Sequence, residues 1–209
     1  MMEVLPAFSK IICSTELNLS EREFTIIEDY LWKLELFHTD EHIATATDDK
    51  FVLRHPTLKF LHDKIMREFN RLNDNHLKYD NEFVINTSWY THSKPGQYAS
   101  YHNHSNCMFS GVFYVKVPER SGEIEFDSHS GNTFQPRSSE PNILNTTSIK
   151  IKPERGNLLF FNSNIYHEIK KNESDQVRVS IAFNLLPIGD LGYFDSHLKL
   201  NFDESGFTI

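Results

Sequence analysis

Residues 157–186 read NLLFFNSNIYHEIKKNESDQVRVSIAFNLL, and this stretch decides the fold class. Two runs rich in apolar, β-branched and aromatic residues, 157–162 and 177–186, enclose a shorter run at 165–170, with polar turn residues between them. Short runs separated by turns predict antiparallel strands. Further runs of this kind precede the stretch, at 83–90, 97–104, 109–117, 122–127 and 147–151. The chain is therefore expected to form an antiparallel β-sandwich or barrel from about residue 83 onward.

The first third of the chain has a helical pattern instead. Residues 20–37 open with Ser20 and carry Glu23 three places on, which is a capping box, and apolar residues then follow at helical spacing. A second helix is predicted from about Pro56 to Leu72, with its apolar residues in one stripe. Both stripes are expected to pack on the sheet rather than to bind a cofactor.

The length of 209 residues suits one domain and is too short for two ordinary domains with a linker. We expect a single domain over 1–209, with a helical support region at 1–80, a β core at 83–187 and a peripheral tail at 188–209. The segment 128–146 is rich in Ser, Asn, Pro and Gly and has no periodicity. It is expected to be a long loop and is a candidate lid over a functional site.

Charge and cysteine content limit the partners and the compartment. A formal net charge of −8 argues against a general nucleic-acid-binding surface. No apolar run approaches the roughly 20 residues that span a bilayer, and the N-terminus lacks the pattern of a signal peptide. Cys13 and Cys107 are the only cysteines, which fits a reducing compartment. We expect a cytoplasmic protein without a membrane partner, while nothing in the pattern indicates the oligomeric state.

Three histidines and one arginine are the candidates for chemistry. His102 and His104 are two apart in a predicted strand, so their side chains leave the same face and can reach one metal ion. A pair of this kind is nevertheless more often a surface or hydrogen-bonded pair. His167 heads a later predicted strand and is the third candidate ligand.

Arg178 lies in a strand whose residues alternate between two faces, with Arg178, Ser180 and Ala182 on one of them. If this face points into a barrel, Arg178 needs an anionic partner, because an unpaired buried charge is costly. A carboxylate ligand would supply that partner. The alternatives are that Arg178 faces solvent or pairs with an internal Asp or Glu.

The order of these blocks resembles the 2-oxoglutarate- and Fe(II)-dependent oxygenase superfamily. Residues 98–114 (YASYHNHSNCMFSGVFY) come first, and GEIEF, GNLLFFNSNIYHEI and RVSIAFN follow. The H-x-H segment followed by S-G-V-x-Y is more closely similar to a group of oxygenases common in tailed phages and marine bacteria. The resemblance covers about 84–187 and rests on four separated blocks in the right order, which makes it more specific than any single block.

The resemblance implies a double-stranded β-helix, or jelly roll, with helices packed on one outer face. It also implies Fe(II) at the open end, with 2-oxoglutarate as a small-molecule co-substrate. His167 corresponds to the distal metal ligand, and Arg178 with Ser180 to the receptor of the distal carboxylate of 2-oxoglutarate. Tyr98 or Asn86 could donate a hydrogen bond to 2-oxoglutarate, although each is equally compatible with core or rim packing.

The activity that the resemblance implies is that of a dioxygenase, either a hydroxylase or a demethylase, which converts O2 and 2-oxoglutarate to CO2 and succinate. The primary substrate is left open among a protein side chain, a nucleotide and a small metabolite. A phage-encoded member would act in the host cytoplasm.

The chain departs from the superfamily at one position, because residue 104 is His where an acid is usual. Two ligand sets follow: three histidines, which we favour, or one of His102 and His104 completed by Asp127 or Glu125. Two rival functions also follow, a three-histidine cupin-like enzyme that does not use 2-oxoglutarate and a non-catalytic jelly-roll module. An inward-facing Arg178 with Ser180 would favour the oxygenase, since a structural metal has no need of them.

Overall fold

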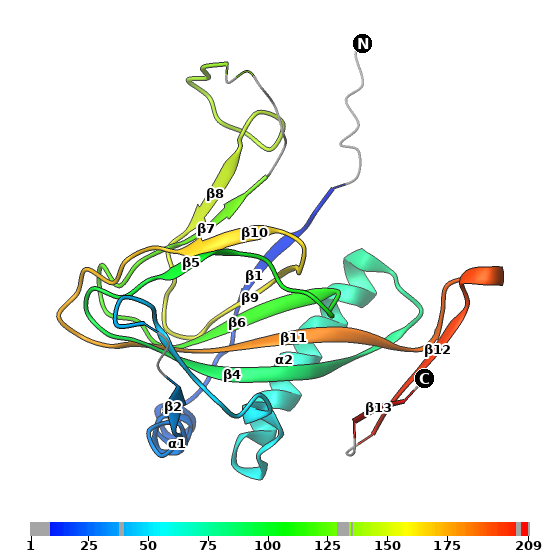
Figure 1. Ribbon diagram of the computed structural model, residues 1–209, viewed down its shortest axis with the longest axis horizontal. Coiled ribbons are helices and arrows are strands. Elements are labelled where there is room, and N and C mark those ends of the chain that lie inside the picture. Colours follow the sequence, from blue (N-terminus) through cyan, green and yellow to red (C-terminus); the bar gives the residue numbers. More distant parts are fainter. Residues whose placement is uncertain (1–8, 38–39, 129–133, 135, 204–205, 209) are drawn as a thin grey trace.

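Two antiparallel sheets face each other in the computed structural model, which describes residues 9–37, 40–128, 134, 136–203 and 206–208 (Figure 1). The larger sheet has the strand order β1 (Ile12–Glu16), β9 (Asn157–Asn162), β6 (Phe109–Lys116), β11 (Arg178–Leu191), β4 (Glu82–Ser93), β3 (Thr45–Thr47) and β2 (Leu36–Phe37). The smaller sheet has the order β5 (Ala99–His102), β10 (Tyr166–Ile169), β7 (Ile124–Asp127) and β8 (Ser148–Ile151). This arrangement confirms the predicted jelly roll.

The long strand β11 forms the centre of the larger sheet and has two different faces. Val179, Ile181 and Phe183 are buried in the core beneath the helices. Arg178 and Ser180 lie on the opposite face, which points toward the smaller sheet. The predicted division of this strand into two faces is therefore confirmed, and it follows from the period of two that every strand imposes on its side chains.

Helices α1 (Glu21–Leu31) and α2 (Lys59–Leu72) cover the outer face of the larger sheet (Figure 1). The predicted capping box is present, because the Ser20 hydroxyl accepts from the backbone N–H of Glu23 at 3.3 Å and the Glu23 carboxylate accepts from the backbone N–H of Ser20 at 2.7 Å. The prediction that this helix reaches residue 37 is wrong. It ends at Leu31, since residues 36 and 37 pair with β3 as a short strand.

Shorter turns complete the helical part of the chain. They are the 3₁₀ turns η1 (Val52–Arg54), η2 (Pro56–Leu58) and η4 (Phe194–Ser196), and the π turn η3 (Asn73–Leu77). The second predicted helix is therefore η2 followed by α2, and its whole predicted stripe is buried: Leu58, Leu61, Ile65, Phe69 and Leu72. None of the helices in the described ranges has the length and apolarity that a bilayer crossing requires.

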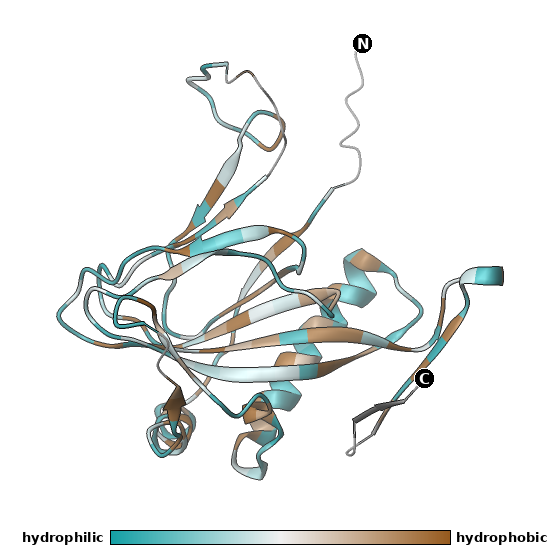
Figure 2. Ribbon diagram, viewed as in Figure 1, coloured by the Kyte–Doolittle hydropathy of each residue, from teal (hydrophilic) through white to brown (hydrophobic). Residues whose placement is uncertain are grey.

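The molecule has two hydrophobic cores, one on each side of the larger sheet. The larger core lies between this sheet and the helices, where the ring of Phe69 contacts those of Phe109 and Phe160. The smaller core lies between the two sheets and includes Phe126 and Phe161. Figure 2 shows the resulting mixture of apolar and polar positions along the strands. The smaller core leaves room for polar side chains at one end of the sandwich.

Two segments differ from the structure that the sequence predicts, and a third lies partly outside the described residues. The first 80 residues contain strands as well as helices, because β1 pairs with β9 at the edge of the larger sheet. The tail forms a hairpin of β12 (Leu198–Asp203) and β13 (Gly206–Thr208), and β12 pairs with the end of β11. Within the predicted loop 128–146, residues 129–133 and 135 lie outside the described residues.

Candidate metal and co-substrate site

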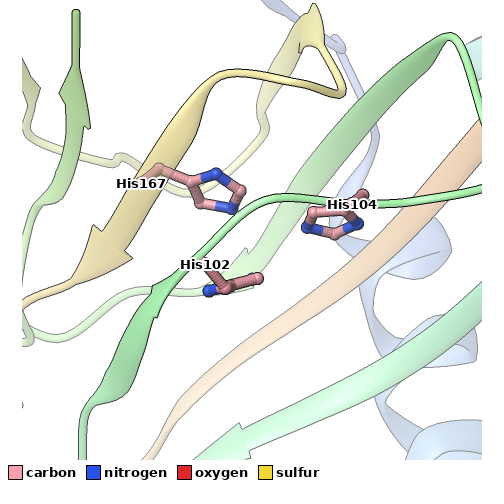
Figure 3. Close-up of side chains that lie close together, drawn as sticks. All are labelled: His102, His104 and His167. Carbon is pink, nitrogen blue, oxygen red and sulfur yellow. The ribbon is translucent and has the colours of Figure 1, made fainter. Parts of the chain in front are cut away.

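Two histidines on paired strands of the smaller sheet and a third in the loop after one of these strands lie close together (Figure 3). His167 in β10 is directly opposite His102 at the end of β5, since these strands pair antiparallel. His104 follows two residues after His102. One ring nitrogen from each of the three histidines lies within 4.8 Å of the others. The three histidines are therefore a candidate ligand set for one metal ion.

The strand that carries the H-x-H segment is shorter than predicted. It was expected to reach residue 104, but β5 ends at His102. The backbone N–H of His104 instead donates to the carbonyl oxygen of Ser163 at 3.0 Å, which ties this segment to the turn between β9 and β10. The two histidines therefore converge because a loop is held in place, and not because both side chains leave one face of a strand.

Each of the three rings uses Nδ1 in a hydrogen bond to an oxygen atom. The acceptors are the Ser100 carbonyl for His102 (2.6 Å), the Asn184 Oδ1 atom for His104 (2.9 Å) and the Ile165 carbonyl for His167 (3.0 Å). A carbonyl oxygen can only accept, so Nδ1 carries the proton and a neutral ring presents the lone pair of Nε2. Metal-binding histidines are commonly oriented by bonds of this kind.

Burial keeps two of the rings in the form that binds metals. It lowers the pKa of His167 to about 3 and the pKa of His104 to about 4. Electrostatic repulsion between the clustered imidazoles lowers both values further, while the hydrogen bonds to Ile165 and Asn184 oppose the shift in part. Both imidazoles are therefore neutral at pH 7, as a metal ligand must be.

Asp127 and Glu125, the acids considered as alternative ligands, lie on the other face of β7. The buried residues of this strand are Ile124 and Phe126, which belong to the core between the sheets. Glu125 forms an ion pair with Lys170, with 2.6 Å between Oε2 and Nζ. The ligand set that includes an acid therefore has no geometric support.

The histidines open on a cavity of about 110 Å³ between the two sheets. On the side of the larger sheet, its walls are Trp89, Thr91, Tyr114, Arg178, Ser180 and Ala182. The metal-ligand candidates and the arginine of the R-x-S segment therefore share one cavity, although they come from opposite sheets.

Arg178 is buried at the wall of this cavity, with only 3% of its surface exposed. Its Nη1 atom donates to the carbonyl oxygens of Ser121 at 2.6 Å and Gly122 at 3.2 Å. Within the part of the chain that the structure describes, no carboxylate forms an ion pair with it. Both alternatives, a solvent-facing arginine and an internal ion pair, are thus excluded for these residues, and the guanidinium keeps a buried charge without a counter-charge.

Tyr114 is a cavity residue that the sequence did not reveal. Its hydroxyl is buried and makes no hydrogen bond among the described residues. Burial raises the pKa of Tyr114 to about 12, and the positive charge of Arg178 opposes that shift. Residues 109–115 are all buried, so this run carries no polar alternation that would tell which side chains face the cavity.

The other two residues considered for 2-oxoglutarate, Tyr98 and Asn86, are not among those that line the cavity. Tyr98 is 39% exposed, and its backbone bonds to the segment around His42. Asn86 is the extra residue of a bulge in β4, which turns its amide toward the Asn106 carbonyl at 3.3 Å. Both residues lie on a strand or directly beside one, but neither side chain lines the cavity that contains the three histidines.

The turn residues around His92 favour an exposed position on sequence grounds, and that expectation is wrong. Strand β4 continues to Ser93, and His92 is buried with its ring edge-on to Trp32 at 5.3 Å between centroids.

Comparison with known proteins gives one family and a set of similar folds. Residues 87–184 match the family described as "Putative 2OG-Fe(II) oxygenase". A search of the curated proteins finds no match to the sequence. The narrower likeness to oxygenases of phages and marine bacteria stays a prediction.

Several solved structures share the fold at low sequence identity. The non-haem α-ketoglutarate-dependent carbocyclase SnoK from nogalamycin biosynthesis is 16% identical, with a TM-score of 0.63 over 86% of this chain and 80% of its own. The viral collagen prolyl hydroxylase of Paramecium bursaria Chlorella virus-1, in complex with 2-oxoglutarate, is 18% identical, with a TM-score of 0.57 over 83% and 94%.

HygX from Streptomyces hygroscopicus, with nickel, 2-oxoglutarate and hygromycin B bound, is 11% identical, with a TM-score of 0.60 over 84% of this chain and 82% of its own. The matched residues include β11 up to Asn184 and both sides of the histidine cavity. Residues 87–184 are therefore similar in sequence to the 2-oxoglutarate- and Fe(II)-dependent oxygenases, and the chain shares the fold of these solved enzymes.

Proposed function

We propose that His102, His104 and His167 hold Fe(II) through their Nε2 atoms. The support is the donor set itself: three rings in one cavity, each with Nδ1 engaged by an oxygen and Nε2 left over. Three imidazoles suit a divalent iron ion and leave coordination positions for other ligands. When bound, the iron supplies the chemistry that activates O2.

The co-substrate 2-oxoglutarate is proposed to lie between the histidines and Arg178. The observation that carries this proposal is the buried guanidinium in the same cavity, for which the described part of the chain supplies no counter-charge. Ser180 is next along the inner face of β11, and the free hydroxyl of Tyr114 is a further donor. These three groups would receive the distal carboxylate, which compensates the buried charge of Arg178 and gives Tyr114 an acceptor.

The protein is a dioxygenase that uses 2-oxoglutarate and Fe(II). Its own residues form the cavity in which we propose that both lie. The cavity lies between the two sheets, and Trp89 and Thr91 form its wall on β4. We place the enzyme in a reducing cytoplasm, because both cysteines are free. The primary substrate, whether a protein side chain, a nucleotide or a metabolite, must approach the histidine end of the cavity.

The experiment that tests this function is an anaerobic titration of the protein with Fe(II), followed by 2-oxoglutarate. Chelation of the iron by the 2-oxo acid should produce a visible charge-transfer band that saturates with 2-oxoglutarate and is not produced by succinate. With O2, the same samples should consume 2-oxoglutarate and release succinate. Iron binding without any response to 2-oxoglutarate would favour the three-histidine cupin-like enzyme, and absence of iron binding would favour a non-catalytic jelly roll.

A further inference from the structure

Asn184 is a buried amide on the inner face of β11, beyond the residues that line the cavity, and it contacts three other side chains. Its Oδ1 atom accepts from Nδ1 of His104 at 2.9 Å and from the hydroxyl of Ser110 at 2.7 Å. Its Nδ2 atom donates to the hydroxyl of Thr87 at 2.9 Å. Every polar atom of the Asn184 side chain therefore has a partner, and one partner is a proposed metal ligand.

The three supporting residues form one row across the larger sheet. Asn184 on β11 is directly opposite Ser110 on β6 and directly opposite Thr87 on β4. Because cross-strand neighbours have side chains on the same face, all three point toward the smaller sheet. The amide of Asn184 is thus held between residues of the two neighbouring strands. This arrangement fixes the direction of its hydrogen bond to His104.

A second contact limits the ring of His104. Trp89 stacks on it, with 5.7 Å between ring centroids and 26° between the ring planes. The stacking restricts the tilt of the imidazole, whereas the bond to Asn184 determines which nitrogen carries the proton. His104 is the residue that stands where the superfamily usually has a carboxylate, and a carboxylate needs no such choice because either oxygen can bind a metal.

We propose that Asn184 is the positioning residue that makes His104 a metal ligand. Its side-chain carbonyl keeps the proton of His104 on Nδ1, so that Nε2 presents its lone pair to the ion. With the amide reversed, the NH2 group would face Nδ1, the proton would move to Nε2 and the ring could not bind. The inference rests on the proposed metal site, but the state of the ring can be measured without any metal.

The first test is the tautomer of His104 in the metal-free protein, measured at neutral pH by NMR with ¹⁵N-labelled histidine. The expected result is Nδ1 protonated and Nε2 unprotonated. A ring protonated on Nε2 in the unsubstituted protein would overturn the proposal directly, with no variant needed.

The second test compares two substitutions. Asn184→Leu has a similar volume and removes the acceptor, so a population of His104 with the proton on Nε2 should appear, while the tautomers of His102 and His167 stay as they are. Asn184→Asp keeps an acceptor oxygen and should restore the Nδ1-protonated ring. Unchanged His104 resonances in Asn184→Leu would contradict the proposal, and Asn184→Asp provides a second variant if the leucine protein does not fold.

The third test measures the metal alone, with Co(II) as a spectroscopic probe. Affinity should fall about 10- to 100-fold in Asn184→Leu, which is the usual effect of losing a partner that orients a ligand, and most of it should return in Asn184→Asp. Asn81→Leu is the matched control, because the Asn81 amide donates to two backbone carbonyls of β11, those of Ile188 and Asp190, and to none of the histidines. An equal loss in Asn81→Leu would show a merely structural effect.

These measurements separate the two proposals. If the unsubstituted protein fails to bind Co(II) or Fe(II), the proposed metal site is wrong, whatever the tautomer of His104. If it binds the metal and Asn184→Leu binds it equally well with an altered tautomer, the site stands and the role of Asn184 is wrong.

Discussion

The two ends of the inner face of β11 differ in how well their polar groups are satisfied. At the histidine end, the Nδ1 atom of each ring has an oxygen acceptor, and Asn184 is bonded on all sides. At the other end, Arg178 has only two backbone carbonyls, and Tyr114 has no hydrogen-bond partner among the described residues. The histidine end is organised by the protein itself, whereas the Arg178 end holds a buried charge that the proposed carboxylate of 2-oxoglutarate would balance.

The largest expected effect comes from the metal end. His167→Ala should abolish Fe(II) binding, because this histidine is buried and no other group in the turn before it can replace its imidazole. Anaerobic isothermal titration with Fe(II) measures the loss, and His62→Ala on α2 is a control that should bind normally. Comparable losses in His102→Ala and His104→Ala would support three histidines, and an effect from only one of them would point to a different third ligand.

Acid should destabilise the metal-free protein through the same end. The pKa values of His167 and His104 in the folded protein, about 3 and about 4, lie below the ordinary 6.5. Below pH 6.5 these two histidines are therefore protonated in the unfolded chain but not in the folded chain. As a result, the free energy of unfolding decreases as the pH falls. The slope is on the order of 1 kcal/mol per pH unit for each histidine.

Urea titrations between pH 7 and pH 5 measure this dependence. In His167→Gln the free energy of unfolding should depend less steeply on pH, because one of the two buried imidazoles is absent. A flat profile in the unsubstituted protein would mean that the rings are not neutral and buried.

The co-substrate end should respond to 2-oxoglutarate and not to metal. Arg178→Ala removes a charge-assisted pair worth about 1.5–3 kcal/mol, so 2-oxoglutarate affinity should fall roughly 10- to 100-fold. Arg178→Lys keeps the charge but loses the two-pronged geometry, and it should rescue the affinity only in part. Fe(II) affinity without the co-substrate should barely change.

Surface Arg155→Ala is the control for Arg178, since its pair with Glu21 lies outside the cavity. An Arg178 variant that folds and binds 2-oxoglutarate as tightly as the parent would remove the main support for the co-substrate site.

The smallest effect is expected from Tyr114→Phe, and it should have opposite signs in two measurements. Affinity for 2-oxoglutarate should weaken by about tenfold, at the low end of the roughly 1.5–3 kcal/mol typical of a hydrogen bond to a charged group, because Arg178 still pairs with the carboxylate. The metal-free protein should be as stable as the parent or more stable, because the lost hydroxyl is buried and has no hydrogen-bond partner among the described residues. A clear loss of stability in urea would mean that the hydroxyl already has a partner in the absence of 2-oxoglutarate.

Local sequence was sufficient for the parts of this protein that depend on local rules. The capping box at Ser20, the apolar stripe of α2 and the two faces of β11 all follow from periods and caps that neighbouring residues impose. The three histidines could also be named in advance, because residue type and the order of the blocks carry that information. The hydrogen-bond partners that orient the three imidazole rings could not be predicted from the sequence.

Tertiary structure decided which faces meet and which groups are left unpaired. Asn184 joins Ser110 and Thr87 only because β11 lies between β6 and β4, with 74 residues separating Asn184 from Ser110 in the chain. The outward direction of Asp127, the bulge at Asn86 and the free hydroxyl of Tyr114 depend on the register between strands far apart in sequence. Register is a long-range property, so a residue's identity reveals what it can bond, and only the fold determines what is within reach.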